Sequence, residues 1–390
     1  MYKIPLMRSA FINEFETKQE LAEFILNTDR LSMHTKCFEF EQEFSKYIGS
    51  KDSILFNSGG SANLAMLQSL KNLGRLKDND NVGFAAVTWS TNTMPIIQLG
   101  MNAIPVDCTV NTLNVMAQNL EESIKTHNLK AFFATNVLGF AGDLPEIKKV
   151  CEKHKVIFIE DNCESLGCEI EGIKTGNFGV AASCSFYVAH HMSTIEGGMV
   201  CTSDEELAEM LRIVRANGWD RNLSEQQQQK WRADFDIDSF RANYTFFDLG
   251  YNLRPTEITG FLGLSQLKYL QENNTKRCDN FLEINELIKV NDDFISLDFQ
   301  HITKPSPFAF SFICKSKKTR DKYINSFKEQ GVELRPMIAG NMQNQPFFHK
   351  YKTVDVKLPN SDYLDQCAFY CGNFPDMTSE DLQLIKSVLV

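Results

Sequence analysis

The chain lacks any apolar run that approaches the roughly 20 residues needed to cross a bilayer. It also lacks an excess of positive charge: 40 Lys and Arg stand against 50 Asp and Glu, which gives a net charge of -10. This balance argues against electrostatic binding of nucleic acid along the chain, because such binding needs basic patches that neutralise phosphates. The first 20 residues turn polar and acidic too early for a signal peptide. We therefore expect a cytoplasmic protein that binds neither membrane nor nucleic acid.

The sequence has no spacing typical of a metal site or of a disulfide framework. Neither HxxxH nor CxxC occurs. The eleven Cys are odd in number and scattered, and most lie in apolar runs, as Cys201 and Cys314 do. A buried thiol in such a run behaves as a small hydrophobic side chain. We therefore expect reduced, structural cysteines and no metal.

Seven short apolar runs alternate with helical patterns between residues 53 and 203. Strands that alternate with helices predict a mostly parallel sheet covered on both faces. The expected fold class is α/β, with a large seven-stranded domain over residues 31–255 that follows an N-terminal arm or helix over residues 1–30. The predicted strands are Ser53–Asn57, Val82–Val87, Ala103–Val106, Ala131–Val137, Val156–Glu160, Ala182–Val188 and Met199–Thr202.

The pattern changes after Pro255 and predicts a smaller α+β C-terminal domain over residues 256–390. Just before it, the polar stretch 221–244 contains a run of four Gln and is expected to form a loop. The elements predicted for the C-terminal domain are helices over residues 256–270, 278–290 and 319–330 and a strand over residues 309–314.

The first candidate binding segment, NSGGSAN at residues 57–63, joins a predicted strand to a predicted helix. Small residues there allow backbone N–H groups and a helix N-terminus to approach an anion such as a phosphate. The segment matches neither the P-loop nor GxGxxG. A tight turn with Ser61 as the helix cap therefore remains an equal alternative.

A second candidate consists of Glu160 and Asp161, which end another apolar strand. Ligands of open α/β sheets bind beyond the carboxyl ends of the strands, so a carboxylate here could pair with a ligand cation. An Asp in this position often only caps the next helix, and both interpretations stay open.

The third candidate is the segment 185–198, in which His190 and His191 follow a strand and precede a glycine pair. Adjacent His residues are commonly an accident of a surface loop. Histidine is nevertheless the natural proton carrier near neutral pH, and the end of a strand is a favourable place for one.

In order and spacing, these three segments resemble the nucleotide-sugar aminotransferases, which have the fold type I of the enzymes that depend on pyridoxal phosphate. The resemblance implies that the turn near residue 60 holds the cofactor phosphate and that Asp161 pairs with the pyridine nitrogen. In that family a Ser-Phe-x-x-x-Lys run supplies the lysine that binds the cofactor covalently. Here the run begins at Ser185 and ends at His190, so the lysine is missing.

The missing lysine cannot be restored by a local shift, because no Lys occurs between Lys174 and Lys230. Only a primary amine holds this cofactor covalently, whereas an imidazole can move a proton. The substitution resembles one subgroup, the nucleotide-sugar 3-dehydratases, which use noncovalent pyridoxamine phosphate. The likeness extends over nearly the whole chain through Trp89-Ser90, Glu196-Gly197-Gly198, Gly218-Trp219-x-Arg221-Asn222-Leu223, Gly250-Tyr251-Asn252-x-Arg254-Pro255 and Arg335-Pro336.

The reaction implied by this resemblance has two halves. L-Glutamate first converts pyridoxal phosphate to pyridoxamine phosphate, and the amine then condenses with a 4-keto-6-deoxyhexose linked to a nucleotide. His190 serves as acid and base for loss of the C3 hydroxyl, while Asp161 keeps the pyridine nitrogen protonated. GDP-4-keto-6-deoxy-D-mannose is the favoured substrate, and synthesis of an O-antigen sugar such as colitose is the implied context.

The resemblance also implies roles for further residues, and it implies a homodimer whose active sites are shared between subunits. Trp89 would stack on the cofactor ring and Glu164 would lie near its hydroxyl. Asn252 would reach the phosphate from the neighbouring subunit. The remaining implied contacts are Gly60, Ser61 and Ser185 to the phosphate, and Arg221, Arg254 and Arg335 to the diphosphate or the glutamate carboxylate.

Three alternatives stay beside this interpretation. A sister group with His at this position carries an iron–sulfur cluster, but no Cys lies between Cys201 and Cys278 to ligate one, so we expect no cluster. The chain could be a true aminotransferase with a displaced lysine. It could also be a catalytically silent relative, although intact Asp161, Glu164 and Ser185 argue against decay.

Overall fold

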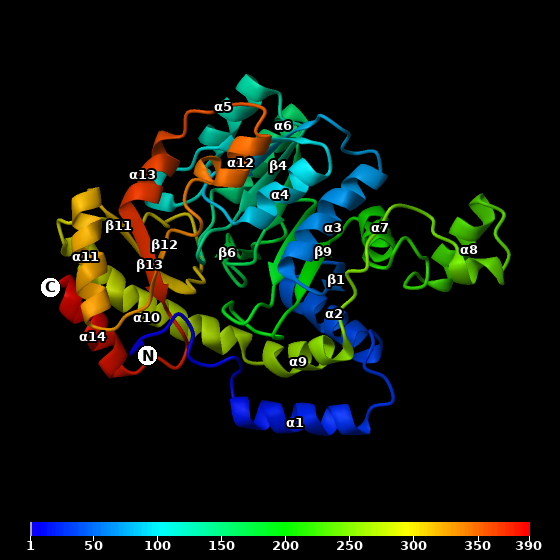
Figure 1. The fold of residues 1–390 in the computed structure, drawn as a ribbon, viewed down its shortest axis with the longest axis horizontal. Coiled ribbons are helices and arrows are strands. Elements are labelled where there is room, and N and C mark those ends of the chain that lie inside the picture. Colours follow the sequence, from blue (N-terminus) through cyan, green and yellow to red (C-terminus); the bar gives the residue numbers. More distant parts are fainter. Residues whose placement is uncertain (1) are drawn as a thin grey trace.

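The computed structural model describes residues 2–390, and its largest element is a seven-stranded sheet (Figure 1). The strand order is β1-β9-β8-β5-β4-β2-β3. Neighbours from β8 to β3 pair in parallel, whereas β9 runs antiparallel to both β1 and β8. The predicted mostly parallel sheet is therefore confirmed. Its strands are β1 (Asp52–Phe56), β2 (Asn81–Ala85), β3 (Asn102–Val106), β4 (Ala131–Thr135), β5 (Ile157–Asp161), β8 (Ala181–Ser185) and β9 (Gly198–Thr202).

Helices cover both faces of this sheet because successive strand side chains point to opposite sides. In β4, Phe132 packs into one core cluster and Phe133 into another. The face of Phe132 is covered by α5 (Ala117–His127) and α6 (Leu144–His154). The face of Phe133 is covered by α3 (Gly59–Asn72), α4 (Ser90–Gln98) and α7 (Glu205–Arg215), and α2 (Thr35–Ile48) belongs to a third cluster with part of β1, β8 and β9.

A second, four-stranded antiparallel sheet is built from the C-terminal part of the chain, in the order β10-β11-β13-β12. The predicted strand 309–314 is confirmed as β11. The predicted helices 256–270 and 319–330 correspond to α9 and α11. The predicted helix 278–290 is too short, because it is the second half of one continuous 21-residue helix, α10, whose polar first half masks the apolar pattern. The elements are β10 (Phe294–Ile295), β11 (Ala309–Cys314), β12 (Leu334–Pro336), β13 (Ala368–Gly372), α9 (Glu257–Leu267), α10 (Leu270–Val290), α11 (Lys317–Glu329), α12 (Pro346–Tyr351), α13 (Pro359–Cys367) and α14 (Ser379–Leu389).

Smaller elements complete the fold. The N-terminal segment contains α1 (Glu14–Asn27), whose Phe24 stacks on Phe261 of α9 at 4.7 Å between ring centroids. The expectation of a loop over residues 221–244 is wrong, because Ser224 and Gln227 form a capping box that begins α8 (Glu225–Asp234), set apart from the main body in Figure 1. The division at residues 30/31 and 255/256 stays a prediction. The other elements are the short hairpin β6 (Glu169–Ile170) and β7 (Ile173–Lys174), and the 3-10 turns η1 (Val110–Thr112), η2 (Arg241–Tyr244) and η3 (Met342–Asn344).

Across residues 2–390, no helix combines the length and the apolar character needed to span a bilayer. Within the same residues, no three His, Cys, Asp or Glu side chains come together as a metal site would require. All eleven Cys are free thiols, and nine of them are buried, as expected from the apolar runs that contain them.

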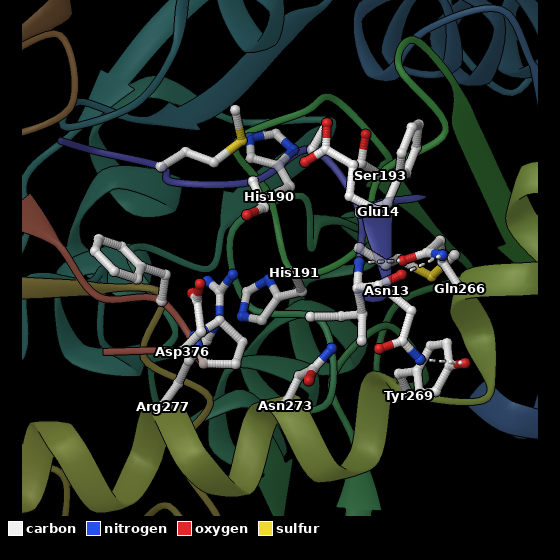
Figure 2. A pocket seen from close by; sticks show the side chains of 18 of the residues that line it. Asn13, Glu14, His190, His191, Ser193, Gln266, Tyr269, Asn273, Arg277 and Asp376 are labelled. Atoms are coloured by element: carbon white, nitrogen blue, oxygen red, sulfur yellow. Dashed lines mark hydrogen bonds between the residues drawn. The ribbon is translucent and has the colours of Figure 1, made fainter. Parts of the chain in front are cut away.

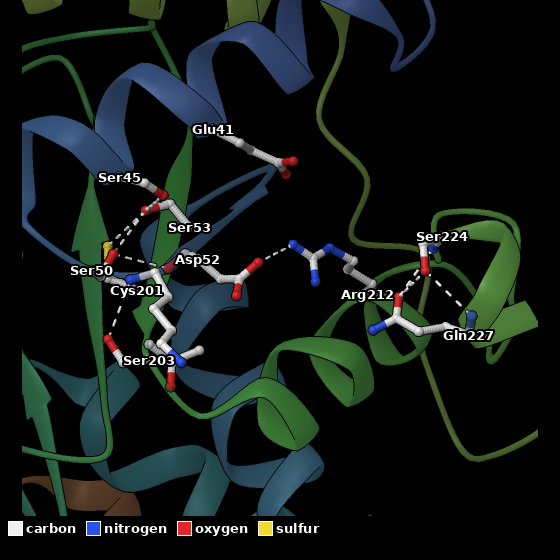
Figure 3. Close-up of polar contacts among 12 residues, drawn as sticks. Glu41, Ser45, Ser50, Asp52, Ser53, Cys201, Ser203, Arg212, Ser224 and Gln227 are labelled. Carbon is white, nitrogen blue, oxygen red and sulfur yellow. Dashed lines mark hydrogen bonds and ion pairs between the residues drawn. The ribbon is translucent and has the colours of Figure 1, made fainter. Parts of the chain in front are cut away.

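A buried ion pair joins α2, β1 and α7. Arg215 is fully buried, and its Nη1 donates to Glu41 Oε1 and, at 2.8 Å, to the Leu55 carbonyl. The same carboxylate oxygen accepts the Leu55 N–H at 2.8 Å. Nearby, Arg212 pairs with Asp52 at 2.5 Å in a partly exposed position (Figure 3). The two pairs offer a direct comparison of buried and exposed charge.

Glu41→Gln should therefore destabilise the protein by about 3–5 kcal/mol, because it leaves the Arg215 charge buried without its counter-charge. Asp52→Asn, which breaks the partly exposed pair, should cost about 1 kcal/mol or less. Urea denaturation of both variants measures the difference. Equal losses would contradict the account of the buried pair.

Candidate active site

Asp161 ends the central strand β5, and its buried carboxylate is held by three donors. Oδ2 accepts from Asn63 Nδ2 at 2.9 Å and from Asn92 Nδ2 at 2.8 Å, and Oδ1 accepts the Cys163 N–H at 2.9 Å. The donors come from α3, α4 and the turn after β5, so three segments converge on one side chain. The carboxylate does not cap a helix, which settles the alternative left open by the sequence.

The neighbouring Glu160 has a structural role on the opposite side of β5. Its Oε1 accepts the N–H groups of Phe178 and Gly179 at 2.8 and 2.9 Å, and its Oε2 accepts the Gly176 N–H at 2.8 Å. These bonds fold the turn that leads into β8. Of the two carboxylates at this strand end, only Asp161 faces the carboxyl-edge groups of the candidate site.

The Ser-Gly turn places the N-terminus of α3 against Ser185. Ser58, not Ser61, is the helix cap, and its side chain accepts the Ser61 N–H at 3.1 Å. A Cβ on Gly59 would lie 2.6 Å from the Ser185 Cβ, so only glycine fits there. The helix begins with two glycines, which leave its N–H groups open to an anion beside the hydroxyl of Ser185. The structure thus brings Gly60, Ser61 and Ser185 to one place.

Glu164 is the second acid of the site and differs from Asp161 in its surroundings. Its Oε2 accepts one N–H, that of Leu138, at 3.1 Å. Burial, with the nearby Asp161 charge, raises the pKa of the Glu164 carboxyl to about 8. Leu138 has a φ of +54°, a strained conformation that aims its N–H at this carboxyl. Near neutral pH, Glu164 can therefore donate a proton or a hydrogen bond, whereas Asp161 accepts three.

His190 and His191 lie in one loop but make different contacts. Nε2 of His191 donates to the Ser306 carbonyl at 2.8 Å, which anchors the loop to the chain that precedes β11. Nδ1 of His190 is buried without a hydrogen-bond partner. Burial lowers the pKa of His190 to about 4, although the Asp161 charge opposes this shift, and lowers the pKa of His191 to about 3. Both rings are therefore neutral near pH 7. Nδ1 of His191 also lacks a partner, but its ring is fixed through Nε2, whereas no hydrogen bond within residues 2–390 holds the His190 side chain.

Two observations mark the His loop as a place under constraint. Ile195, a β-branched residue, has a φ of +71°, a costly conformation that a functional loop can retain. Phe308 touches both rings edge-on or tilted, with centroids 6.0 Å from His190 and 5.8 Å from His191. The loop is thus packed against a residue of the C-terminal part of the chain.

The predicted aromatic residue and the three predicted arginines differ in exposure and in their contacts. Trp89 lies between β2 and α4, directly before the helix, and 55% of its surface is exposed, which leaves its indole open to a flat ligand ring. Arg221 lies over the Trp219 ring at 3.9 Å. Asn252 accepts from Arg254 at 3.1 Å in its own chain. Arg335 pairs with Glu333 at 2.7 Å. All three arginines thus already have partners within the chain.

Several site residues escaped the sequence interpretation. Asn63 lay within a segment already singled out and Asn92 follows Trp89 by three residues, but nothing in the pattern showed that both reach Asp161. Ser306 and Phe308 come from a distant part of the chain. Only the fold brings them to the His loop, so no local signal could have identified them.

These residues fit pyridoxal or pyridoxamine phosphate. The open N-terminus of α3 would hold the phosphate, and the Asp161 carboxylate would pair with a protonated ring nitrogen. The unpartnered His190 supplies a neutral base. The set can bind a flat anionic ring, stabilise positive charge at its nitrogen and move a proton beside it.

The sheet with its antiparallel β9 and the carboxyl-edge aspartate define the class of the protein: it has the fold type I of pyridoxal-phosphate-dependent enzymes. Within this class, the chain belongs to the DegT/DnrJ/EryC1/StrS aminotransferase family, whose model matches residues 13–389.

Within this family, the chain is similar to several known 3-dehydratases over nearly its whole length. The GDP-4-keto-6-deoxy-D-mannose 3-dehydratase of Yersinia pseudotuberculosis is 33% identical over 371 residues, which cover 94% of this chain and 93% of that protein. A solved GDP-4-keto-6-deoxymannose 3-dehydratase with a trapped PLP-glutamate geminal diamine has a TM-score of 0.89 and 30% identity. A His-to-Asn mutant of such an enzyme with bound GDP-perosamine has a TM-score of 0.91 and 31% identity. Both structures match over the full length of both chains.

Glu164→Gln should change the pH dependence of stability of the cofactor-free protein. The Glu164 carboxyl releases its proton near pH 4.5 when unfolded but only near pH 8 when folded. Between these values the folded state binds the extra proton, so the wild-type free energy of unfolding falls as pH rises, by at most about 1.4 kcal/mol per unit. The variant has no such carboxyl, so its free energy of unfolding should rise relative to that of wild type from pH 5 to pH 8. Urea denaturation of both proteins across this pH range measures the change. A difference in stability that stays constant with pH would contradict the raised pKa of Glu164.

Proposed function

We propose that the protein removes the C3 hydroxyl of a nucleotide-linked 4-keto-6-deoxyhexose, with GDP-4-keto-6-deoxy-D-mannose as the favoured substrate. The observation that carries this proposal is His190, a neutral imidazole with a free Nδ1 at the position where an aminotransferase needs a lysine. The relatives that cover 94 to 100% of the chain, at 30 to 33% identity, are named for this dehydration. A displaced lysine and a silent site are both less consistent with this arrangement.

The cofactor of the proposed reaction is noncovalent pyridoxamine phosphate, which supplies an amine that condenses with the 4-keto group and a ring that accepts electrons. Gly60, Ser61 and Ser185 bind its phosphate. Asp161 holds the proton on the ring nitrogen, because its three other donors fix the carboxylate in place. Trp89 covers one face of the ring.

His190 moves the protons of the reaction. Its neutral ring accepts a proton from the carbon that carries the amine and delivers one to the C3 hydroxyl as this group leaves as water. Glu164, protonated near pH 7, donates a hydrogen bond to the ring hydroxyl or to the bound sugar. L-Glutamate is oxidised to 2-oxoglutarate, C3 is reduced and ammonia is released.

The finer parts of the proposal concern assembly and setting. We propose a homodimer in which Asn252 of one subunit completes the phosphate site of the other. Exposed apolar side chains around the site support an incomplete single subunit, since Trp89, Tyr187 and Ile195 are each about half exposed. Arg221, Arg254 and Arg335 remain candidates for the diphosphate. The eleven free thiols support a reducing, cytoplasmic setting, and a surface polysaccharide is the proposed destination of the sugar.

His190→Asn should slow dehydration by at least about 100-fold while cofactor affinity changes little, because the variant removes the proton carrier but not the phosphate site. A single turnover of the protein preloaded with pyridoxamine phosphate measures the effect. His349→Asn, on the exposed surface of α12, is the matched control and should turn over as wild type does. Unchanged turnover in His190→Asn would overturn the proposed base.

His190→Lys tests the register of the His loop. A primary amine at this position should capture pyridoxal phosphate covalently, so borohydride treatment should leave a cofactor-sized mass increase on the peptide that contains residue 190. The wild-type protein should show none. A variant that stays unmodified would place residue 190 outside reach of the cofactor.

A further inference from the structure

A cavity of about 440 Å³ opens beside the His loop (Figure 2), and no residue of the Ser-Gly turn lines it. Its walls come from the segment that precedes and begins α1, from the first half of α10, and from the turn after β13. His190 and His191 both border it. No residue assigned so far to the cofactor or the nucleotide lines this cavity apart from His190. Asn13, Asn273 and Arg277 supply polar groups to its walls.

Arg277 is the unusual member of this lining. Only 7% of its surface is exposed, and its Nε is buried without a hydrogen-bond partner. Among residues 2–390, no carboxylate oxygen lies within 4.0 Å of its guanidinium. Burial lowers the pKa of Arg277 to about 10. A guanidinium that is removed from water without a partner destabilises the protein unless a ligand binds its N–H groups.

The acidic residues of the cavity leave this charge largely uncompensated. Glu272 pairs with Lys276 at 2.7 Å, and Glu14 pairs with Lys18 at 2.5 Å. The charge of Asp376 acts on Arg277, and Figure 2 shows the Asp376 carboxyl on one side of the guanidinium and the His191 ring on the other. The Asp376 charge raises the pKa of Arg277, but burial lowers this pKa by more. The Arg277 fork therefore remains available to a ligand.

We propose that this cavity binds the carboxylate of the amino donor, with Arg277 as its anchor. This inference rests on the proposed function, in which glutamate is the one small carboxylate substrate. A guanidinium fork matches a carboxylate through two parallel hydrogen bonds. The opposite charges of Arg277 and Asp376 also suit a ligand that carries both a carboxylate and an ammonium group. The border with His190 places this ligand next to the base that must serve it.

The comparison with the arginines singled out in the sequence supports this assignment. Arg221 lies over an indole ring, Arg254 bonds Asn252, and Arg335 pairs with Glu333. Each is also exposed to solvent. Arg277 differs from all three because it is buried and has no partner, which is the state of a guanidinium that a ligand completes.

The test compares Arg277→Gln with Lys276→Gln, a neighbour on α10 that lines the same cavity but already pairs with Glu272. Calorimetry of the cofactor-free protein with 2-oxoglutarate measures binding directly. Affinity should fall at least tenfold in Arg277→Gln and by less than threefold in Lys276→Gln. Arg277→Lys, which keeps the charge but loses the fork, should fall between them. Equal affinities of wild type and Arg277→Gln would overturn the proposal.

Kinetics and melting separate this role from a structural one. Arg277→Gln should raise the KM for glutamate at least tenfold, while a single dehydration turnover by protein preloaded with pyridoxamine phosphate stays within twofold of wild type. Its Tm should be unchanged or higher, because an unpartnered buried charge is removed. A lower Tm with parallel losses in both half-reactions would assign Arg277 a structural role and overturn the proposal. If no dehydration occurs in any protein but the binding difference holds, only the proposed function fails.

Discussion

The three hydrogen bonds that hold the Asp161 carboxylate are the constraint around which the site is built. They require α3, α4 and the turn after β5 to meet at the end of the central strand. The same placement of α3 turns its glycine-led N-terminus toward Ser185. One carboxylate thus fixes both the point where a cationic ring nitrogen would be stabilised and the point where an anion would be bound.

The side chains around this point differ in their surroundings, and two of them have shifted pKa values. Asp161 is surrounded by donors, as an anion needs, whereas Glu164 receives a single N–H and burial raises its pKa to about 8. Burial also keeps His190 neutral. An acid whose pKa is raised beside a base whose pKa is lowered is a usual arrangement for proton transfer at pH 7. The site is therefore suited to chemistry that needs a base and a hydrogen-bond donor together.

Much of this could be predicted from local sequence. The seven apolar runs indicated the strands, because a strand buried on both faces must be apolar throughout. Asp161 and His190 were singled out because they come just after such runs, whereas Ser185 lies within a run and was assigned only through the family resemblance. The first half of α10 and the Gln-rich α8 were missed, since polar residues hide helical periodicity and a capping box outweighed the loop-like composition. Asn92, Ser306 and Arg277 could not be found, because their importance arises from contacts between distant segments.

The missing lysine is the fact that separates dehydration from amino transfer, and the product distinguishes them most directly. The protein would be incubated with pyridoxal phosphate, L-glutamate and GDP-4-keto-6-deoxy-D-mannose, and the sugar product analysed by mass. The account predicts a sugar that has lost the C3 oxygen, with ammonia and 2-oxoglutarate released in equal amounts. A sugar that has gained an amine instead would contradict the account and show that the protein transfers amino groups without the lysine.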